Sequence, residues 1–205
     1  MMASPTSARP WMQTASGRVV YLDNPDPASI SIRDIAAHLA KLCRFAGAAD
    51  RFYSVAQHSV LVCRLCADAG PHGQMHALLH DAHEAYIGDI TQPVKRALAA
   101  TAPTALIELE RRLDRAIADH VGLSQVHDGA FRETIHHADL RALATEKRDL
   151  MPDLPDWTGH LPAPWRSTIK PWPWPKAEEQ FLKHFDDLAA MCGMPDRMSH
   201  AGVTA

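Results

Sequence analysis

HALLHDAHEAYIGDITQPVK, residues 76–95, combines an apolar helical pattern with a group of ionisable side chains. Its apolar residues predict a buried helix that ends at Gly88. A helix advances about 100° per residue, so Glu84 lies one turn after His80, and Asp81 lies beside His80. A buried His-Asp pair is costly unless something compensates its charge. The pattern therefore indicates a divalent cation bound by His80 and Asp81.

The rest of the chain is predicted to be mostly helical, with a short β-hairpin over residues 14–23. A first helix begins after Ser31 and ends near residues 44–47. A second runs over residues 55–69, where Gly70 and Pro71 are expected to end it. Further helices are predicted from Pro93 and over residues 103–121, 124–151 and 176–191. Residues 152–175 are rich in Pro and Trp, which excludes regular structure there. We expect a single domain, residues 1–205, with its core at about 30–151.

Composition excludes several classes of protein. The formal net charge is −3, and the chain has no long basic run, which argues against a nucleic-acid polymer as partner. No apolar run approaches about 18 residues and no signal pattern is visible, so we expect a cytoplasmic protein without a membrane contact. Cys63 and Cys66 form one C-x-x-C inside a helical apolar run, without a second pair to complete a zinc site. We interpret them as two buried thiols.

Two more potential ligands lie far from residues 76–95. His58 falls near the apolar stripe of the second predicted helix, and Asp139 falls in HHADLRALA, residues 136–144. A single histidine on an apolar helix face is usually a hydrogen-bonded core residue. Together with His80 and Asp81, however, these residues make two imidazoles and two carboxylates. That set suits a hard-to-borderline divalent cation with two positions open for water and substrate.

The sequence resembles the HD-domain phosphohydrolases, whose metal ligands follow an H…HD…D pattern. It is similar in particular to bacterial 5′-deoxynucleotidases and to phage-type dNTP triphosphohydrolases. The matching stretches cover about residues 40–145 and are RF at 44–45, SVAQHS at 54–59, HDAHE at 80–84, GDITQPVK at 88–95 and HHADL at 136–140. The resemblance implies an all-α HD-domain helical bundle. It also implies that one divalent cation (Co, Zn, Mn or Mg) binds His58, His80, Asp81 and Asp139.

The resemblance also implies roles for residues around that cation. Glu84 would orient or deprotonate the attacking water, and Asp89 would act as a general acid toward the leaving oxygen. Arg44 would hold phosphate and Lys95 would be a second cation for it. Phe45 would stack on base or sugar, at a position where the 5′-deoxynucleotidases typically have Trp. The structural alternatives are solvated charges for Arg44 and Lys95, and a core aromatic for Phe45.

The expected activity is that of a 5′-deoxynucleotidase, which converts a dNMP into deoxynucleoside and phosphate. The alternatives are a dNTP triphosphohydrolase and a nucleotide-binding regulator that does not turn its ligand over. The expected partners are a small-molecule nucleotide and, by analogy with the family, a second copy in a homodimer.

Other histidines suggest competing interpretations. His76 and His80 have zinc-protease spacing, but Ala77 stands where that motif needs its catalytic Glu. We expect His83 to face solvent or to lie behind the ligands, where His136 could also form a hydrogen bond. A second metal would need His120 or His127, which flank a predicted break, so one metal is favoured. The Trp side chains in segment 152–175 could form a lid over the site or pack against the helices, and we favour packing against the helices.

Overall fold

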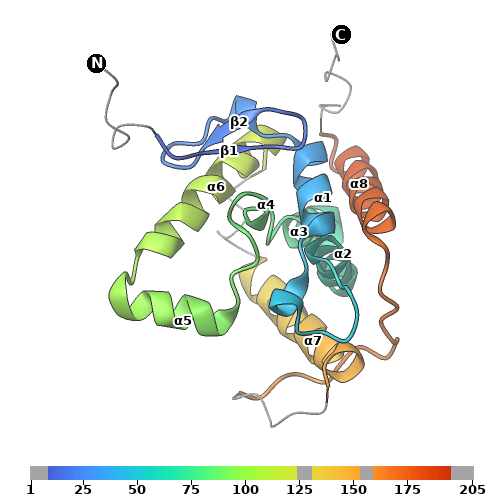
Figure 1. The fold of residues 1–205 in the computed structure, drawn as a ribbon. Helices are drawn as coiled ribbons and strands as arrows, with labels where there is room; N and C mark the ends of the chain where they lie inside the picture. Colours follow the sequence, from blue (N-terminus) through green and yellow to red (C-terminus); the bar gives the residue numbers. More distant parts are fainter. Residues whose placement is uncertain (1–8, 124–130, 153–158, 195–205) are drawn as a thin grey trace, which may run out of the picture.

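The computed structural model describes residues 9–123, 131–152 and 159–194. This part of the chain is mostly helical and begins with a small antiparallel hairpin (Figure 1). The expected hairpin is present, but its first strand lies before the expected range of residues 14–23. Strand β1 (Trp11–Gln13) pairs with β2 (Val19–Tyr21). The turn between them contains Gly17 at a φ of 82°, a conformation that glycine adopts without steric penalty.

Eight α-helices follow within the described residues. They are α1 (Ile32–Lys41), α2 (Val55–Leu65), α3 (Gly70–Leu78), α4 (Glu84–Ile87), α5 (Gln92–Thr101), α6 (Ala105–Val121), α7 (Arg132–Leu150) and α8 (Trp174–Met191). Short 3-10 turns cover Pro27–Ser29, Arg44–Gly47 and Ala67–Ala69. The helices expected from Pro93, over 103–121 and over 176–191 correspond to α5, α6 and α8. Residues 124–130 of the expected segment 124–151 lie outside the described residues.

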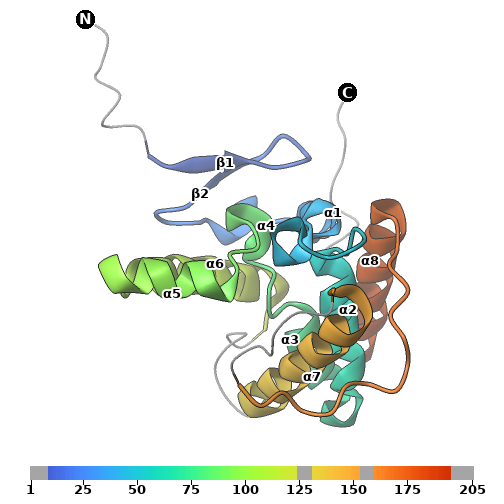
Figure 2. The ribbon, with the colours of Figure 1, turned by 60° about the horizontal axis from the view of Figure 1, so that its bottom comes forward.

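Two hydrophobic clusters hold the helices together. The larger one is formed mainly by α1, α2, α3 and α8, with Leu39, Val60, Met75 and Phe181 among its buried residues. The second joins α2, α3 and α7 with Ile169 of the C-terminal segment. In both views α5 and α6 lie on one side of the bundle and α8 on the other (Figures 1 and 2). The packing of α2 against α7 brings together helices that are about 80 residues apart in sequence.

The single helix expected over residues 76–88 is wrong, because the chain leaves the helix between α3 and α4. His80 Nδ1 lies 2.8 Å from the carbonyl oxygen of Ala77, which in a continuous helix would accept the N–H of Asp81. The following N–H groups bond to carbonyls three residues earlier, which is the tighter spacing of a 3-10 turn. His80 and Asp81 therefore lie in a turn at the end of α3.

The expectation that Gly70 and Pro71 end the second helix is also wrong. Helix α2 ends at Leu65, and Gly70 and Pro71 begin α3. Proline is tolerated in the first turn of a helix, where its missing N–H would have no intrahelical partner. Gly70 has a φ of 70° and a ψ of 179°, which allows the chain to reverse direction before α3.

Residues 159–173 have no regular structure, as was predicted for 152–175, but α8 begins at Trp174, two residues earlier than expected, with Pro175 in its first turn. Trp165 and Trp172 are half-buried and pack against the two clusters, so the packing interpretation holds for these rings. Trp174 and Trp11 are exposed, and Trp157 lies outside the described residues. Within the described ranges no helix has both the length and the apolar character needed to cross a membrane.

Cys63 and Cys66 are buried free thiols, as interpreted from the sequence. Burial raises the pKa of Cys63 to about 12 and the pKa of Cys66 to about 11. Both residues therefore stay protonated near neutral pH and contribute to packing.

The 3-10 turn Arg44–Gly47 contains two strained residues. Phe45 has a φ of 57° and Ala46 a φ of 52°, both in the left-handed region. A non-glycine residue in this region costs about 1–2 kcal/mol. Ala46 is exposed, so its replacement by glycine removes strain and little packing. We expect Ala46→Gly to raise the free energy of unfolding by about 0.5–1 kcal/mol, measured by urea denaturation.

Ala48→Gly is the matched control, because Ala48 is exposed and has an ordinary φ of −75°. It relieves no strain and only adds freedom to the unfolded chain, so it should lower stability slightly. The turn geometry would be wrong if Ala46→Gly were no more stable than Ala48→Gly.

Candidate metal centre

Three ligating side chains meet where α2 faces the turn after α3. His58, His80 and Asp81 each offer one atom, and these atoms lie within 4.8 Å of one another, so the group could hold a metal ion. His58 Nε2 is 3.3 Å from His80 Nε2 and 3.5 Å from Asp81 Oδ2. Asp139 of α7 joins them, with its Oδ1 3.2 Å from the same His58 nitrogen. The structure thus brings together all four residues expected to be ligands.

Local structure fixes the position of His58. Ser54 caps α2 by accepting a hydrogen bond from the Gln57 N–H at 3.2 Å, which places His58 in the first turn of the helix. His58 is completely buried. A buried imidazole at this position must find polar partners, and the residues around it supply them.

The second nitrogen of each imidazole is bound to an oxygen. His58 Nδ1 donates to Glu146 Oε1 at 2.6 Å, and His80 Nδ1 donates to the carbonyl oxygen of Ala77 at 2.8 Å. An oxygen partner requires the proton on Nδ1, which leaves the Nε2 lone pair of a neutral ring free for a metal. Both Nε2 atoms face the group. With the two carboxylates this is an N2O2 set that fits a divalent cation.

The charges around His58 and Asp81 are strongly coupled. Burial raises the pKa of Asp81, but His80, His58 and Arg44 outweigh it, and the pKa falls well below its usual range. Burial and Arg44 lower the pKa of His58, whereas Glu146 and Asp139 raise it to about 10. Without a cation, a proton thus occupies this cluster of carboxylates. A cation bound there takes the place of that proton.

Glu84 and Asp89 lie close to the ligands. Glu84 begins α4 and is 5% exposed, and its Oε2 has no hydrogen-bond partner among the described residues. Burial, followed by Asp81 and Asp89, raises the pKa of Glu84 to about 9. Asp89 follows Gly88, and its pKa is raised mainly by burial, against the opposing effects of Arg44 and the Phe45 N–H. Both carboxyl groups therefore hold a proton to a higher pH than free Asp or Glu.

Arg44 is part of the same site. It is 9% exposed, and its Nη2 donates to Glu146 at 3.1 Å while Nη1 lies 3.8 Å from Asp81 Oδ2. Its Nε is buried and has no hydrogen-bond partner among the residues described. The half-buried ring of Phe45 lies 5.2 Å from the guanidinium carbon. The surface-charge alternative for Arg44 is therefore wrong.

Lys95 of α5 is held by an acidic neighbour. Its Nζ donates to Glu110 Oε1 of α6 at 2.8 Å, and its side chain is 31% exposed. Burial lowers the pKa of Lys95, but Glu110, followed by Glu84 and Asp81, raises it overall. Lys95 is thus within electrostatic range of the site while bonded elsewhere.

The histidines outside the proposed ligand set differ in burial and in their hydrogen-bond partners. His83 does not face solvent: it is buried, and its Nδ1 lies 2.9 Å from Asp114 Oδ1 of α6. His136 and His137 are exposed on α7. His120 Nδ1 lies 2.9 Å from the carbonyl oxygen of Pro27. His127 lies outside the described residues.

Sequence reasoning missed Glu146 and Asp114. Glu146 is completely buried and joins the proposed ligand His58 to Arg44. It follows Asp139 by seven residues, which is two helical turns, so both lie on one face of α7. Asp114 falls on the apolar face of α6 between Leu113 and Ile117, and a carboxylate at such a position signals a buried partner.

Comparison with known proteins identifies relatives but no described activity. No family model matches the chain. The uncharacterized protein YfdR of Escherichia coli (strain K12) is 36% identical over 184 residues, which cover 88% of this chain and 97% of YfdR. The uncharacterized protein RCAP_rcc00048 of Rhodobacter capsulatus is 39% identical over 137 residues, 64% of this chain and 68% of that protein.

Proposed function

The chain belongs to the same family as Escherichia coli YfdR, and from its site we propose that it is an HD-type metal-dependent phosphohydrolase. Its proposed substrate is a deoxynucleoside monophosphate, which it splits into deoxynucleoside and phosphate. The observation that carries the proposal is the orientation of His58 and His80, whose Nε2 atoms face two carboxylates in a buried site. The H…HD…D order of these residues supports the same assignment.

A divalent cation held by His58, His80, Asp81 and Asp139 would lower the pKa of a water and, by the same charge, that of the neighbouring Glu84 carboxyl. Once ionised, Glu84 can take a proton from the attacking water. Asp89, whose pKa is raised, can donate a proton to the leaving sugar oxygen. The two carboxyl groups thus have the opposite tasks that hydrolysis of a phosphate ester requires.

Arg44 is suited to bind the phosphate. A buried guanidinium N–H without an acceptor costs about 1–3 kcal/mol, and the Nε of Arg44 is such a group. A phosphate oxygen would satisfy it through a charge-assisted hydrogen bond. Glu146 holds the guanidinium in place from the other side. Arg44 is therefore held in a fixed position from which it would orient the substrate.

A monophosphate is favoured over a triphosphate by the cations at the site. Of the two expected to meet phosphate, Lys95 is bonded to Glu110 and Arg44 to Glu146, but Arg44 keeps an Nε–H without an acceptor, which makes it the principal contact. A triphosphate carries more negative charge and needs more positive charge to bind. A regulator without activity is disfavoured, because placing the buried Glu84 and the half-buried Asp89 near Asp81 is costly, and proton transfer gives this arrangement a use.

A panel of dNMPs and dNTPs, each with Co²⁺, Mn²⁺, Mg²⁺ or Zn²⁺, tests the proposal. We expect orthophosphate release from dNMPs with at least one metal and none after treatment with EDTA. His80→Ala should abolish release, whereas His137→Ala, on the exposed face of α7, should not change it. Triphosphate released from dNTPs would favour the triphosphohydrolase. Tight nucleotide binding without any release would favour the regulator.

A further inference from the structure

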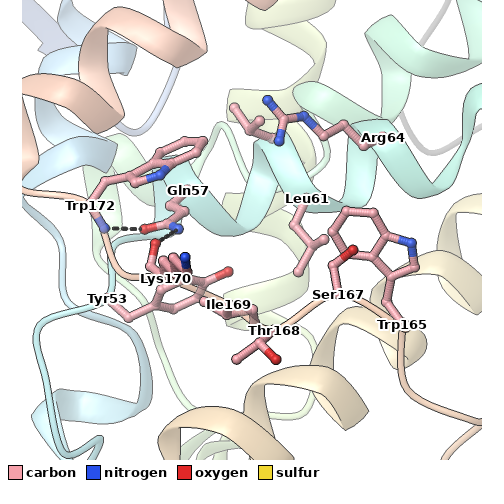
Figure 3. Close-up of a pocket in the computed structure, with 11 residues that line it drawn as sticks. Tyr53, Gln57, Leu61, Arg64, Trp165, Ser167, Thr168, Ile169, Lys170 and Trp172 are labelled. Carbon is pink, nitrogen blue, oxygen red and sulfur yellow. Dashed lines mark hydrogen bonds between the residues drawn. The ribbon is translucent and has the colours of Figure 1, made fainter.

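A cavity separate from the metal centre lies between α2 and the C-terminal segment. Its volume is about 250 Å³, and it is lined by residues of α2, by Tyr53 and by the extended segment 165–172 (Figure 3). None of the four proposed metal ligands lines it. The cavity is therefore a different site from the one at which hydrolysis is proposed.

The lining of the cavity combines flat rings with positive charge. Trp165 and Trp172 contribute two indole rings, and Arg64 and Lys170 contribute two cations. The Arg64 guanidinium lies 5.8 Å from the centre of the Trp172 ring. The described residues that line the cavity include no carboxylate. Such a lining suits a ligand that carries an aromatic ring and a negatively charged group.

Hydrogen bonds hold the walls of the cavity in place. The Gln57 side chain donates to the backbone carbonyl oxygen of Lys170 at 2.9 Å and accepts from the backbone N–H of Trp172 at 2.7 Å (Figure 3). On the α7 side, the Thr145 hydroxyl accepts from the backbone N–H of Trp165 at 2.8 Å. The backbone of the segment is thus fixed by side chains of α2 and α7. Its own side chains are left to line a preformed cavity, which lowers the ordering cost of binding.

The back wall of the cavity is connected to the metal centre. Tyr53 is completely buried, and its carbonyl oxygen accepts a hydrogen bond from the Arg44 N–H at 2.9 Å. Its hydroxyl has no hydrogen-bond partner among the described residues, and burial, followed by the nearby Glu146 carboxylate, raises its pKa. Glu146 in turn binds His58 and Arg44. Gln57, which fixes the wall, precedes His58 in α2. A ligand in the cavity is therefore separated from the metal centre by two side chains.

We propose that this cavity is a second binding site, for a small anion with an aromatic ring, and that its occupant changes metal affinity through Tyr53 and Glu146. The binding part is independent of the proposed hydrolysis, whereas the coupling rests only on the proposed metal centre. A nucleoside monophosphate and an aromatic carboxylate both have the required chemistry.

Binding can be measured by ¹⁹F NMR on the chain labelled with 5-fluorotryptophan, with EDTA present so that no nucleotide is consumed. Trp165→Phe and Trp172→Phe assign the two resonances. The probes are dAMP, indole-3-acetate, deoxyadenosine and inorganic phosphate. We expect dAMP or indole-3-acetate to shift both resonances saturably. Binding of dAMP would identify the ligand as a nucleoside monophosphate, and binding of indole-3-acetate would identify it as an aromatic carboxylate. Deoxyadenosine, which lacks the anionic group, and inorganic phosphate, which lacks the ring, should bind at least tenfold more weakly.

The double variant Arg64→Gln/Lys170→Gln should weaken binding at least tenfold, since it removes both cations. Lys183→Gln, a change at an exposed lysine of α8 that does not line the cavity, is the matched control and should not alter it. The site would be refuted if neither dAMP nor indole-3-acetate gave a saturable shift. Equal affinity in the double variant, or equally tight binding of deoxyadenosine or phosphate, would refute it as well.

The coupling is tested by the dissociation constant for Co²⁺, measured with and without a saturating ligand that the proposed reaction cannot consume. This ligand is indole-3-acetate or, if only dAMP binds, its non-hydrolysable phosphonate analogue. We expect a change of at least threefold, which the double variant should lose. Tyr53→Phe should keep ligand binding and lose the change, since it removes only the buried hydroxyl and keeps the ring that lines the cavity. An unchanged Co²⁺ affinity in the wild type would refute the coupling. Because no step depends on turnover, failure of the proposed hydrolysis would appear separately, as the absence of phosphate release.

Discussion

Glu84→Gln is expected to lower kcat for dNMP hydrolysis by about 10²–10⁴-fold while metal content stays near that of the wild type. The amide keeps the size of the side chain but cannot accept the proton of the attacking water. Glu84 is not among the grouped metal ligands, so the metal should remain. Orthophosphate release and elemental analysis of the purified variant measure the two quantities. Loss of the metal together with activity would show that Glu84 is a ligand instead.

The same variant makes a prediction about stability without metal. The pKa of Glu84 is raised in the folded protein to about 9, so between pH 4.5 and 9 the folded state holds a proton that the unfolded state has lost. Stability due to this group therefore falls as pH rises, by about 1.4 kcal/mol per unit of pKa shift in total. In EDTA, Glu84→Gln should be more stable than the wild type at pH 8 and gain less at pH 5. Glu133→Gln, at an exposed residue of α7, is the control and should show neither effect.

Glu146→Gln is expected to weaken metal binding about 10–100-fold and to destabilise the protein by about 3–5 kcal/mol. Glu146 is completely buried, and it binds His58 at 2.6 Å and Arg44 at 3.1 Å. The amide can still accept a hydrogen bond from His58, but it removes the nearer of the two carboxylates that pair with the buried Arg44 guanidinium. A weaker hold on His58 reduces both the orientation and the basicity of a proposed ligand.

Titration of Co²⁺ and urea denaturation separate the two effects of Glu146→Gln. Co²⁺ affinity should be measured without urea, after circular dichroism has shown that the variant is folded. If the variant is less stable but binds Co²⁺ as tightly as the wild type, Glu146 supports only the fold. Glu133→Gln lies on the same helix and again serves as the matched control, since it is exposed.

Several features could be predicted because they depend on residues close together in sequence. The apolar spacing in α6 and α8 predicted helices, Ser-Gly followed by β-formers predicted the hairpin, and Pro-rich residues 159–173 predicted irregular structure. The order H…HD…D, which the resemblance supplied, predicted that His58, His80, Asp81 and Asp139 would lie together, as they do in the structure. These signals survive without a structure, because periodicity and motif spacing are properties of the chain itself.

Other features depended on contacts between distant residues. The Ala77 carbonyl bound by His80 broke the expected helix, and that break determines how His80 and Asp81 are presented. Glu146 became a partner of His58 and Arg44 only when α7 packed on α2, across 88 and 102 residues of sequence. Helical periodicity states which residues share a face but not which face another helix will cover. The local pattern therefore determined most of the helices and the types of the candidate ligands, whereas tertiary packing determined which polar groups are buried together and how their charges are balanced.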